Sequence, residues 1–61
     1  MTAAYEAALA RLPAAYALAL RYTDSGMSDD EICSELGIER EALQPLLDMA
    51  HRKLRKELTR A

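Results

Sequence analysis

Hydrophobic residues in this 61-residue chain recur three or four positions apart, the spacing that places side chains on one face of an α-helix. The first such stripe comprises Tyr5, Ala8, Leu9 and Leu12. Thr2 precedes this stripe and can cap the start of a helix. The pattern therefore predicts a first helix that begins after Thr2 and ends at about Leu12.

A proline and a run of turn-forming residues bound the second predicted helix. Pro13 fits its first turn, because the backbone N–H that proline lacks has no partner at that position in any helix. The helix should run from about Ala14 to Tyr22 and end before the turn-forming residues 23–26. Its candidate core or partner-facing residues are Tyr16, Leu18, Leu20 and Tyr22.

The strongest local signals lie at the two ends of a third predicted helix, residues 29–36. Ser28 and Glu31 have the spacing of a capping box, in which each side chain accepts a hydrogen bond from the other residue's backbone N–H. Gly37 can adopt the left-handed conformation that ends a helix at low steric cost. Ile38 follows directly and is placed to fold back onto the helix that precedes it.

A longer apolar face predicts a fourth helix over about residues 39–58. The face comprises Leu43, Leu47, Ala50, Leu54 and Leu58, and Ala42, Leu46 and Met49 extend it to one side. Two interpretations of Leu46 and Met49 remain open. They are either additional core residues covered by the first helix, or an exposed patch that binds a partner or a second copy.

Pro45 lies inside this fourth helix, about a turn and a half from its start. Proline removes one backbone hydrogen bond, and its ring crowds the carbonyl four residues earlier. The helix could kink at Pro45, restart with Gln44 as its cap, or tolerate the proline because the donors of the first turn are unpaired anyway. We favour a continuous helix with a modest bend.

These elements define the expected fold class. Two amphipathic helices joined by so short a turn should cross steeply, which is the geometry of a helix-turn-helix. The chain is rich in Ala, Leu and Glu, with no Trp or Phe and only two Gly and two Pro, a composition typical of helical proteins. We expect an all-α fold in which residues 1–61 form a single small four-helix domain, with a helix-turn-helix and a long C-terminal helix.

The cysteine content favours a cytoplasmic location. One cysteine cannot form an intramolecular disulfide, which fits a reducing compartment. We interpret Cys33 as a small buried hydrophobic residue, with a reactive or intermolecular thiol as the alternative. The sequence has no basic start followed by a long apolar run, so we expect neither a signal peptide nor a membrane span.

No residue pattern indicates catalysis. The sequence contains no nucleophile paired with a base, no glycine-rich phosphate loop and no carboxylate pair in a recognisable site. His51 lies beside a basic run without a second ligand nearby, and we interpret it as a flank residue. We therefore expect no enzyme activity, no cofactor, no metal and no small-molecule substrate.

The net charge of −2 hides a strong division of charge along the chain. Residues 24–41 contain seven acidic residues and one arginine, whereas residues 42–61 contain five basic and two acidic residues. The basic run at residues 52–56 could hold a phosphate backbone. Alternatively, it could complement the negative end of the helix dipole and keep the surface soluble.

Several short motifs occur in an order that resembles a known family. They are LP, LRY, S-x-x-E-I-x-x-x-L-G-I, and a basic K-L-R that follows a leucine and an alanine. The matching residues are Leu12, Pro13, Leu20, Arg21, Tyr22, Ser28, Glu31, Ile32, Leu36, Gly37, Ile38, Leu43, Leu47, Ala50, Lys53, Leu54 and Arg55. Over residues 9–58 the chain resembles the fourth conserved region of bacterial RNA polymerase sigma factors, most closely the extracytoplasmic-function type.

The resemblance implies a four-helix domain whose last helix reads the −35 promoter element, and which also docks on the flap of the polymerase β subunit. The family has a polar and basic run between the turn and the basic tail. Here Gln44, Leu46 and Met49 occupy the positions at which arginines are expected. Pro45 replaces a serine, and Asp48 adds a negative charge. The helix arrangement is therefore better matched than the DNA-reading surface.

These comparisons of residue type give two sets of candidate site residues. Those that could contact nucleic acid are Arg40, Gln44, Arg52, Lys53, Arg55 and Lys56. Arg40 and Gln44 lie at the start of the fourth helix, where base-reading side chains are needed, but the flanking Glu39 and Glu41 would repel a polyanion. Those that could bind a protein partner are Ala42, Leu46 and Met49.

Three functions are compatible with these features. The first is a transcription-associated helix-turn-helix domain that docks on RNA polymerase or a transcription regulator and contacts promoter DNA weakly. The second is a degenerate helix-turn-helix whose altered last helix has become a protein-binding or dimerisation surface without DNA binding. The third is a small helical interaction module unrelated to transcription. We favour the first, because the motif matches extend over nearly the whole chain.

Overall fold

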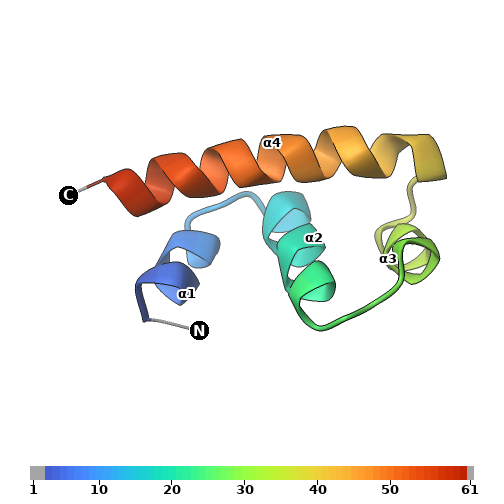
Figure 1. The fold of residues 1–61 in the computed structure, drawn as a ribbon, viewed down its shortest axis with the longest axis horizontal. Coiled ribbons are helices and arrows are strands. Elements are labelled where there is room, and N and C mark those ends of the chain that lie inside the picture. The colour runs from blue at the N-terminus through green and yellow to red at the C-terminus, as the bar shows by residue number, and fades with distance from the viewer. Residues whose placement is uncertain (1–2, 61) are drawn as a thin grey trace.

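The protein is an all-α domain of four helices over residues 3–60, the part of the chain that the computed structural model describes (Figure 1). The helices are α1 (Ala3–Ala10), α2 (Ala14–Asp24), α3 (Asp29–Leu36) and α4 (Arg40–Thr59). The predicted fold class and the order of the four helices are confirmed. The predicted cap at Thr2 lies outside the described residues.

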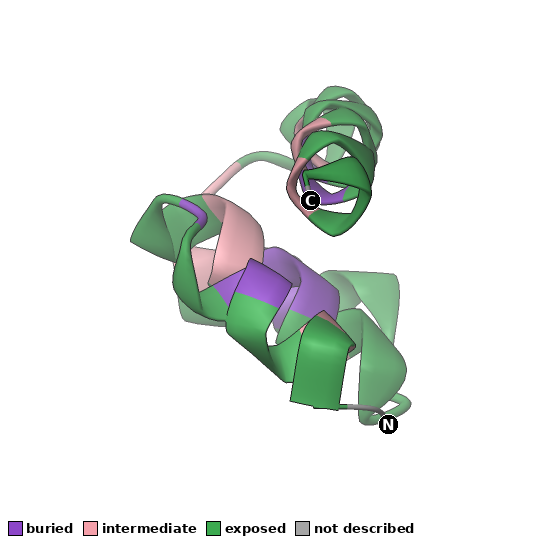
Figure 2. Cartoon of the chain, turned by 90° about the vertical axis from the view of Figure 1, so that its left-hand side faces the viewer, coloured by how far each residue is buried: buried purple, intermediate pink, exposed green. Residues whose placement is uncertain are grey.

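The four helices form two layers, with α4 lying across the other three. α4 contacts α1, α2 and α3, and α2 also contacts α3. Figure 2 looks along α4 and shows the other helices on one side of it. The domain measures 35 × 19 × 14 Å, and its long dimension follows α4 in Figure 1. One face of α4 is therefore left without a covering helix among the described residues.

The larger of two core clusters joins α4 to α1 and α2. Its buried residues are Ala8, Leu9, Leu12, Leu20, Ala50 and Leu54, with Tyr5, Tyr16 and Ala17 packed around them. α4 contributes Ala50 and Leu54 to this cluster, and both belong to the apolar face predicted from the sequence. Leu58, predicted on the same face, is on the surface instead, 46% exposed. Leu18, predicted as a core or partner-facing residue, is 38% exposed and lies outside the core.

The second core cluster closes the junction of α3 and α4. Its buried residues are Ile32, Cys33 and Leu43, with Tyr22, Met27, Leu36, Ile38 and Leu47 around them. Cys33 is buried as expected, and its thiol lies 3.8 Å from the Glu39 carbonyl oxygen. Figure 1 shows α3 nearly end-on while α4 runs across the view, so the two helices cross steeply.

The ends of α3 are held by the residues that the sequence indicated. The Ser28 hydroxyl accepts from the Glu31 N–H at 3.2 Å, and the Ser28 N–H donates to the Glu31 carboxylate at 2.9 Å. This second bond, from the Ser28 backbone, lowers the pKa of Glu31. A carboxyl with a lowered pKa stabilises the fold above its usual titration range, and that contribution is lost as the pH falls through the folded pKa.

Gly37 ends α3 in the left-handed conformation with φ 68°. The Ile38 N–H donates to the Cys33 carbonyl, and the Gly37 N–H donates to the Ser34 carbonyl. These two bonds make a Schellman motif, which satisfies carbonyls at the helix end. Gly26, with φ 87°, ends α2 with bonds of the same pattern.

The structure corrects two details at the junction of α1 and α2. α1 ends at Ala10 rather than at about Leu12, because the residue before a proline is disfavoured in the helical conformation. The chain still turns tightly there, with the Leu12 N–H bonded to the Leu9 carbonyl at 3.1 Å. Pro13 is the N-cap of α2 rather than a residue of its first turn.

α4 continues through Pro45 as one helix of 20 residues. The continuity of the helix agrees with the favoured interpretation and excludes a restart at Gln44. Both Gln44 and Pro45 are exposed. Proline has no N–H to donate to the carbonyl four residues earlier. Because this part of α4 is exposed, water can donate a hydrogen bond to that carbonyl instead.

Two polar pairs tie α1 to α2. The Tyr5 hydroxyl donates to the Asp24 carboxylate at 2.5 Å, and Arg21 forms a salt bridge of 2.8 Å with Glu6. Partial burial, followed by the hydrogen bond to Asp24, raises the pKa of Tyr5 to about 12. The neutral phenol is therefore the form that stabilises this contact.

Replacing Tyr5 with Phe tests this contact through its pH dependence. A raised folded pKa gives stability that is fully present below the unfolded pKa of about 10 and is lost as the pH rises through about 12. Tyr5→Phe should therefore be less stable than the wild type at pH 8, and the difference should shrink between pH 10 and 12. Urea denaturation across this pH range measures the difference in the free energy of unfolding.

Tyr22→Phe, whose hydroxyl has no partner within residues 3–60, is the control. A constant difference between Tyr5→Phe and the wild type would contradict the assignment.

Candidate functional site

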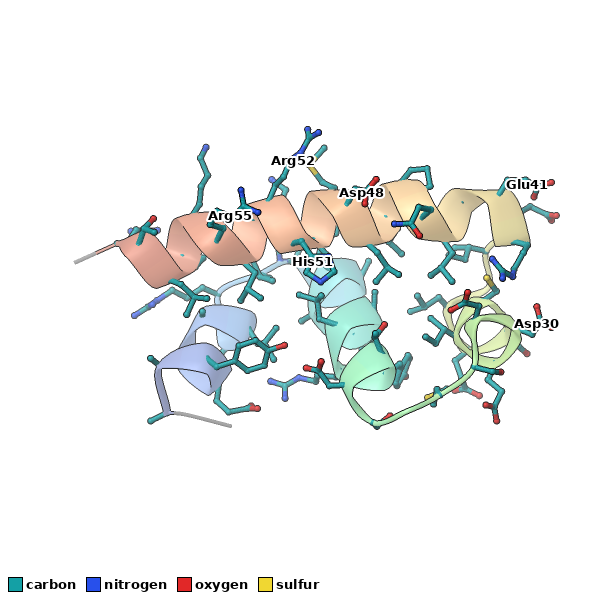
Figure 3. The ribbon with its side chains drawn as sticks, in the orientation of Figure 1. Asp30, Glu41, Asp48, His51, Arg52 and Arg55 are labelled. Carbon is teal, nitrogen blue, oxygen red and sulfur yellow. The ribbon has the colours of Figure 1, made fainter. Side chains whose placement is uncertain are left out.

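The uncovered face of α4 carries most of the candidate residues. Leu43, Ala50 and Leu54 point into the core, so the opposite side of the helix faces solvent. Figure 3 shows Asp48 and Arg52 projecting from α4 on the side away from the other helices, and Glu41 at its first turn. We refer to this side, Glu41, Asp48, Met49, Arg52, Arg55 and Lys56, as the outer face of α4.

Arg40, the first residue of α4, is held by the acidic start of α3. Its Nη2 lies 3.0 Å from Asp29 Oδ2, and its Nε lies 3.3 Å from Asp30 Oδ1. All three side chains are at least half exposed, so each pair contributes at most about 1 kcal/mol. The pairs nevertheless direct the guanidinium toward α3 and partly neutralise its charge.

Gln44 is also engaged within the chain. Its Nε2 donates to Asp48 Oδ1 at 2.9 Å, one helical turn further along. A glutamine that reads adenine must present its oxygen and nitrogen together to the base edge. Breaking the contact with Asp48 would leave that carboxylate beside the approaching DNA.

The start of α4 is therefore an acidic surface. Glu39 caps the helix through its backbone without a side-chain bond, and Glu41 lies in the first turn. Asp29 and Asp30 lie beside them through their bonds to Arg40. With Asp48, the partner of Gln44, five carboxylates thus lie near the two expected base-reading residues. This arrangement disfavours the approach of a polyanion.

The second half of α4 has the opposite charge. Arg52, Arg55 and Lys56 are exposed and form no salt bridge with any residue in the described range. Lys53 differs from its neighbours, because its ammonium lies 5.6 Å from the centre of the Tyr16 ring. A cation over an aromatic face is attracted to it, so Lys53 stabilises the contact between α4 and α2.

An open groove of about 420 Å³ runs along this basic segment. It is lined by Met49, Arg52, Lys53, Arg55, Lys56 and Thr59. All of the lining residues belong to α4, so the groove is a channel between side chains of one helix rather than an enclosed cavity.

The predicted partner residues lie on one flank of the outer face. Ala42 is exposed, Leu46 is half-buried and Met49 is 40% exposed. None of them belongs to either core cluster. Leu46 and Met49 therefore do not form extra core beneath α1, and Met49 is available at the surface.

Two contacts of the site were not predicted from the sequence. They are the pairing of Arg40 with Asp29 and Asp30, and the placement of Lys53 over Tyr16. The partners are separated by ten or more residues, and only the relative placement of the helices brings them together. The one available signal was the acidic first turn of α3, at residues 29–31.

The remaining candidates form no further site. His51 is exposed, and no group of three or more His, Cys, Asp or Glu residues in the described range could hold a metal ion. No helix formed by residues 3–60 is both long enough and apolar enough to cross a membrane. Comparison of the chain with protein-family models, with curated proteins and with solved structures finds no match.

The acidic surface at the start of α4 makes a testable prediction about DNA affinity. Asp29→Asn with Asp30→Asn removes two negative charges and frees Arg40. At a separation of about 10 Å in water, two charges account for about 0.8 kcal/mol, or roughly a fourfold gain in affinity for duplex DNA. Fluorescence anisotropy at low salt measures this gain.

The matched control for this prediction is Glu6→Gln with Asp24→Asn. These substitutions change the net charge equally but lie on α1 and α2. Equal gains in the two double variants would show that net charge, rather than the local field at α4, governs DNA affinity.

Proposed function

We propose that the protein is a transcription-associated docking module, which binds RNA polymerase or a regulatory protein through the outer face of α4. In this proposal the start of α4 does not read bases. The link to transcription comes from the resemblance of the motifs to sigma factor region 4. The choice of a protein partner over a base-reading role comes from the contacts at the start of α4.

The observation that carries the proposal is the engagement of both expected base readers by carboxylates. Arg40 is bonded to Asp29 and Asp30, and Gln44 is bonded to Asp48. A base-reading helix needs free bidentate side chains at its start, together with a field that attracts phosphates. This helix start has neither property.

The exposed apolar flank supports a protein partner. Met49, at the middle of α4, is 40% exposed beside the half-buried Leu46. Methionine adapts its shape to a partner and is common in protein-binding surfaces. Its neighbours Arg52 and Lys56 lack salt-bridge partners among the described residues, so they can form the charged rim of an interface.

A second function, contact with the DNA backbone, is favoured by one observation. Arg52, Arg55 and Lys56 are exposed and lie together in the C-terminal half of α4, away from the acidic start. Three cations in one helical segment can hold phosphates without reading sequence. In this second proposal DNA binding is weak, independent of sequence and strongly reduced by salt.

Replacing Met49 with Lys tests the docking proposal. The substitution removes an apolar contact from the middle of the outer face, and a residue that anchors an interface costs more than about 1 kcal/mol when it is lost. We expect binding to purified bacterial core RNA polymerase, measured by biolayer interferometry, to weaken by about tenfold. The helical circular-dichroism signal should be unchanged, because Met49 lies outside both core clusters.

Leu18→Lys is the matched control, because Leu18 is exposed to nearly the same extent, 38% against 40% for Met49, but lies on α2. This variant should bind polymerase like the wild type. Equal behaviour of the wild type and Met49→Lys, including no binding by either, would contradict the docking proposal.

A further inference from the structure

The charge on the exposed side of α4 reverses near the middle of the helix. Glu41 and Asp48 lie before Met49, whereas Arg52 and Lys56 lie after it. Figure 3 shows Glu41, Asp48, Arg52 and Arg55 in this order along α4. The outer face is therefore acidic in its first half and basic in its second half.

The charges at the two ends of this face are too far apart to neutralise each other within one chain. Glu41 and Lys56 are 15 residues apart on a continuous helix, which corresponds to about 22 Å at 1.5 Å per residue. Within residues 3–60, Glu41, Arg52, Arg55 and Lys56 form no salt bridge, and Asp48 accepts a hydrogen bond from Gln44. The face keeps both kinds of charge available to a partner.

We propose that this face binds a second copy of the chain, with the two α4 helices antiparallel and related by a two-fold axis near Met49. An antiparallel arrangement places the acidic half of each helix beside the basic half of the other. A two-fold axis makes every such pairing occur twice. The proposal rests on the docking function of α4 and adds an identical chain as a partner of the same face.

The register of the helix fits this arrangement. Glu41 lies eight residues before Met49 and Lys56 lies seven residues after it, so in the antiparallel pair they lie within about 1.5 Å of each other along the axis. Asp48 and Arg52 of the two copies lie within about 3 Å along the axis by the same measure. Glu41 thus acquires a basic neighbour in Lys56, whereas Asp48 lies equally close along the axis to the Arg52 and to the Asp48 of the other copy.

The axis also brings together the apolar part of the face. Each Met49 lies opposite the Met49 of the other copy, and the exposed area of both side chains is removed from water. Pro45 leaves the approach clear, since it adds no long side chain one turn before Met49. The antiparallel orientation also places the opposite ends of the two helix dipoles side by side.

A second copy fits this face better than nucleic acid does. A polyanion would be attracted to Arg52 and Lys56 but repelled by Glu41 and Asp48 on the same face. An identical chain carries complementary charge along the whole helix. The dimer should therefore weaken as salt screens these exposed pairs, while remaining independent of nucleic acid.

Sedimentation of charge-reversed variants tests the proposal. One variant carries Glu41→Lys and Asp48→Lys, and the other carries Arg52→Glu and Lys56→Glu. The wild type should self-associate in a series reaching about 1 mM, and each variant alone should associate at least about tenfold more weakly. An equimolar mixture of the two variants should recover association to within about threefold of the wild type, because each face again meets its complement.

A third variant controls for attraction between oppositely charged proteins in general. Ala7→Lys with Glu35→Lys adds positive charge at exposed positions on α1 and α3, away from the outer face. Its mixture with the Arg52→Glu and Lys56→Glu variant should not associate. Circular dichroism of every variant confirms that the helices are intact.

The outcomes separate the dimer from the docking function. A monomeric wild type at about 1 mM, or recovery no greater than in the control mixture, overturns the dimer. If polymerase binding still depends on Met49 in that case, the docking proposal stands without the dimer. If neither association depends on the outer face, both proposals fail.

Discussion

The burial of one face of α4 against three short helices is the interaction on which the rest of the structure depends. α1 and α3 have eight residues each, too few to be stable helices alone in water. Leu54 and Ala50 give α1 and α2 a surface to pack on, and Leu43 does the same for α3. Burying one leucine is worth about 1.5–3 kcal/mol, a large part of the ~5 kcal/mol expected for so small a domain. The fold therefore fixes which side of α4 remains for other molecules.

The division of charge gives the remaining side its character. The acids that start α3 hold Arg40, so the beginning of α4 presents carboxylates rather than a free guanidinium. At the other end, Arg52 and Lys56 have no acidic neighbour within bonding distance in the described structure. Such a surface favours one orientation of a bound partner, because the partner must place basic groups at the acidic end of α4 and acidic groups at its basic end. That requirement explains how a chain with a net charge of only −2 can have strong electrostatic preferences.

Local signals in the sequence predicted most of the fold. Ser28, Glu31 and Gly37 act within a few residues of themselves, so the bounds of α3 follow from neighbours in the chain. The end of α1 and the role of Pro13 were less well predicted. Proline is compatible with the start of a helix, but it also disfavours the helical conformation in the residue before it, and both effects act at this junction. At the candidate site, the sequence identified Met49 and Arg40 as candidate residues. It did not specify whether Met49 is buried or which residues pair with Arg40. Both depend on how separate helices are placed, which hydrophobic periodicity does not specify.

We propose that the outer face of α4 is a protein-binding surface and that a second copy of the chain binds to it. A dilution series of amide NMR spectra, from about 1 mM to about 20 μM, tests it residue by residue without any substitution. Dissociation of the pair should shift the amide signals of Glu41, Met49 and Arg52 and leave those of α1 unchanged. Spectra that do not change on dilution, or changes centred on Leu18 of α2, would contradict the claim.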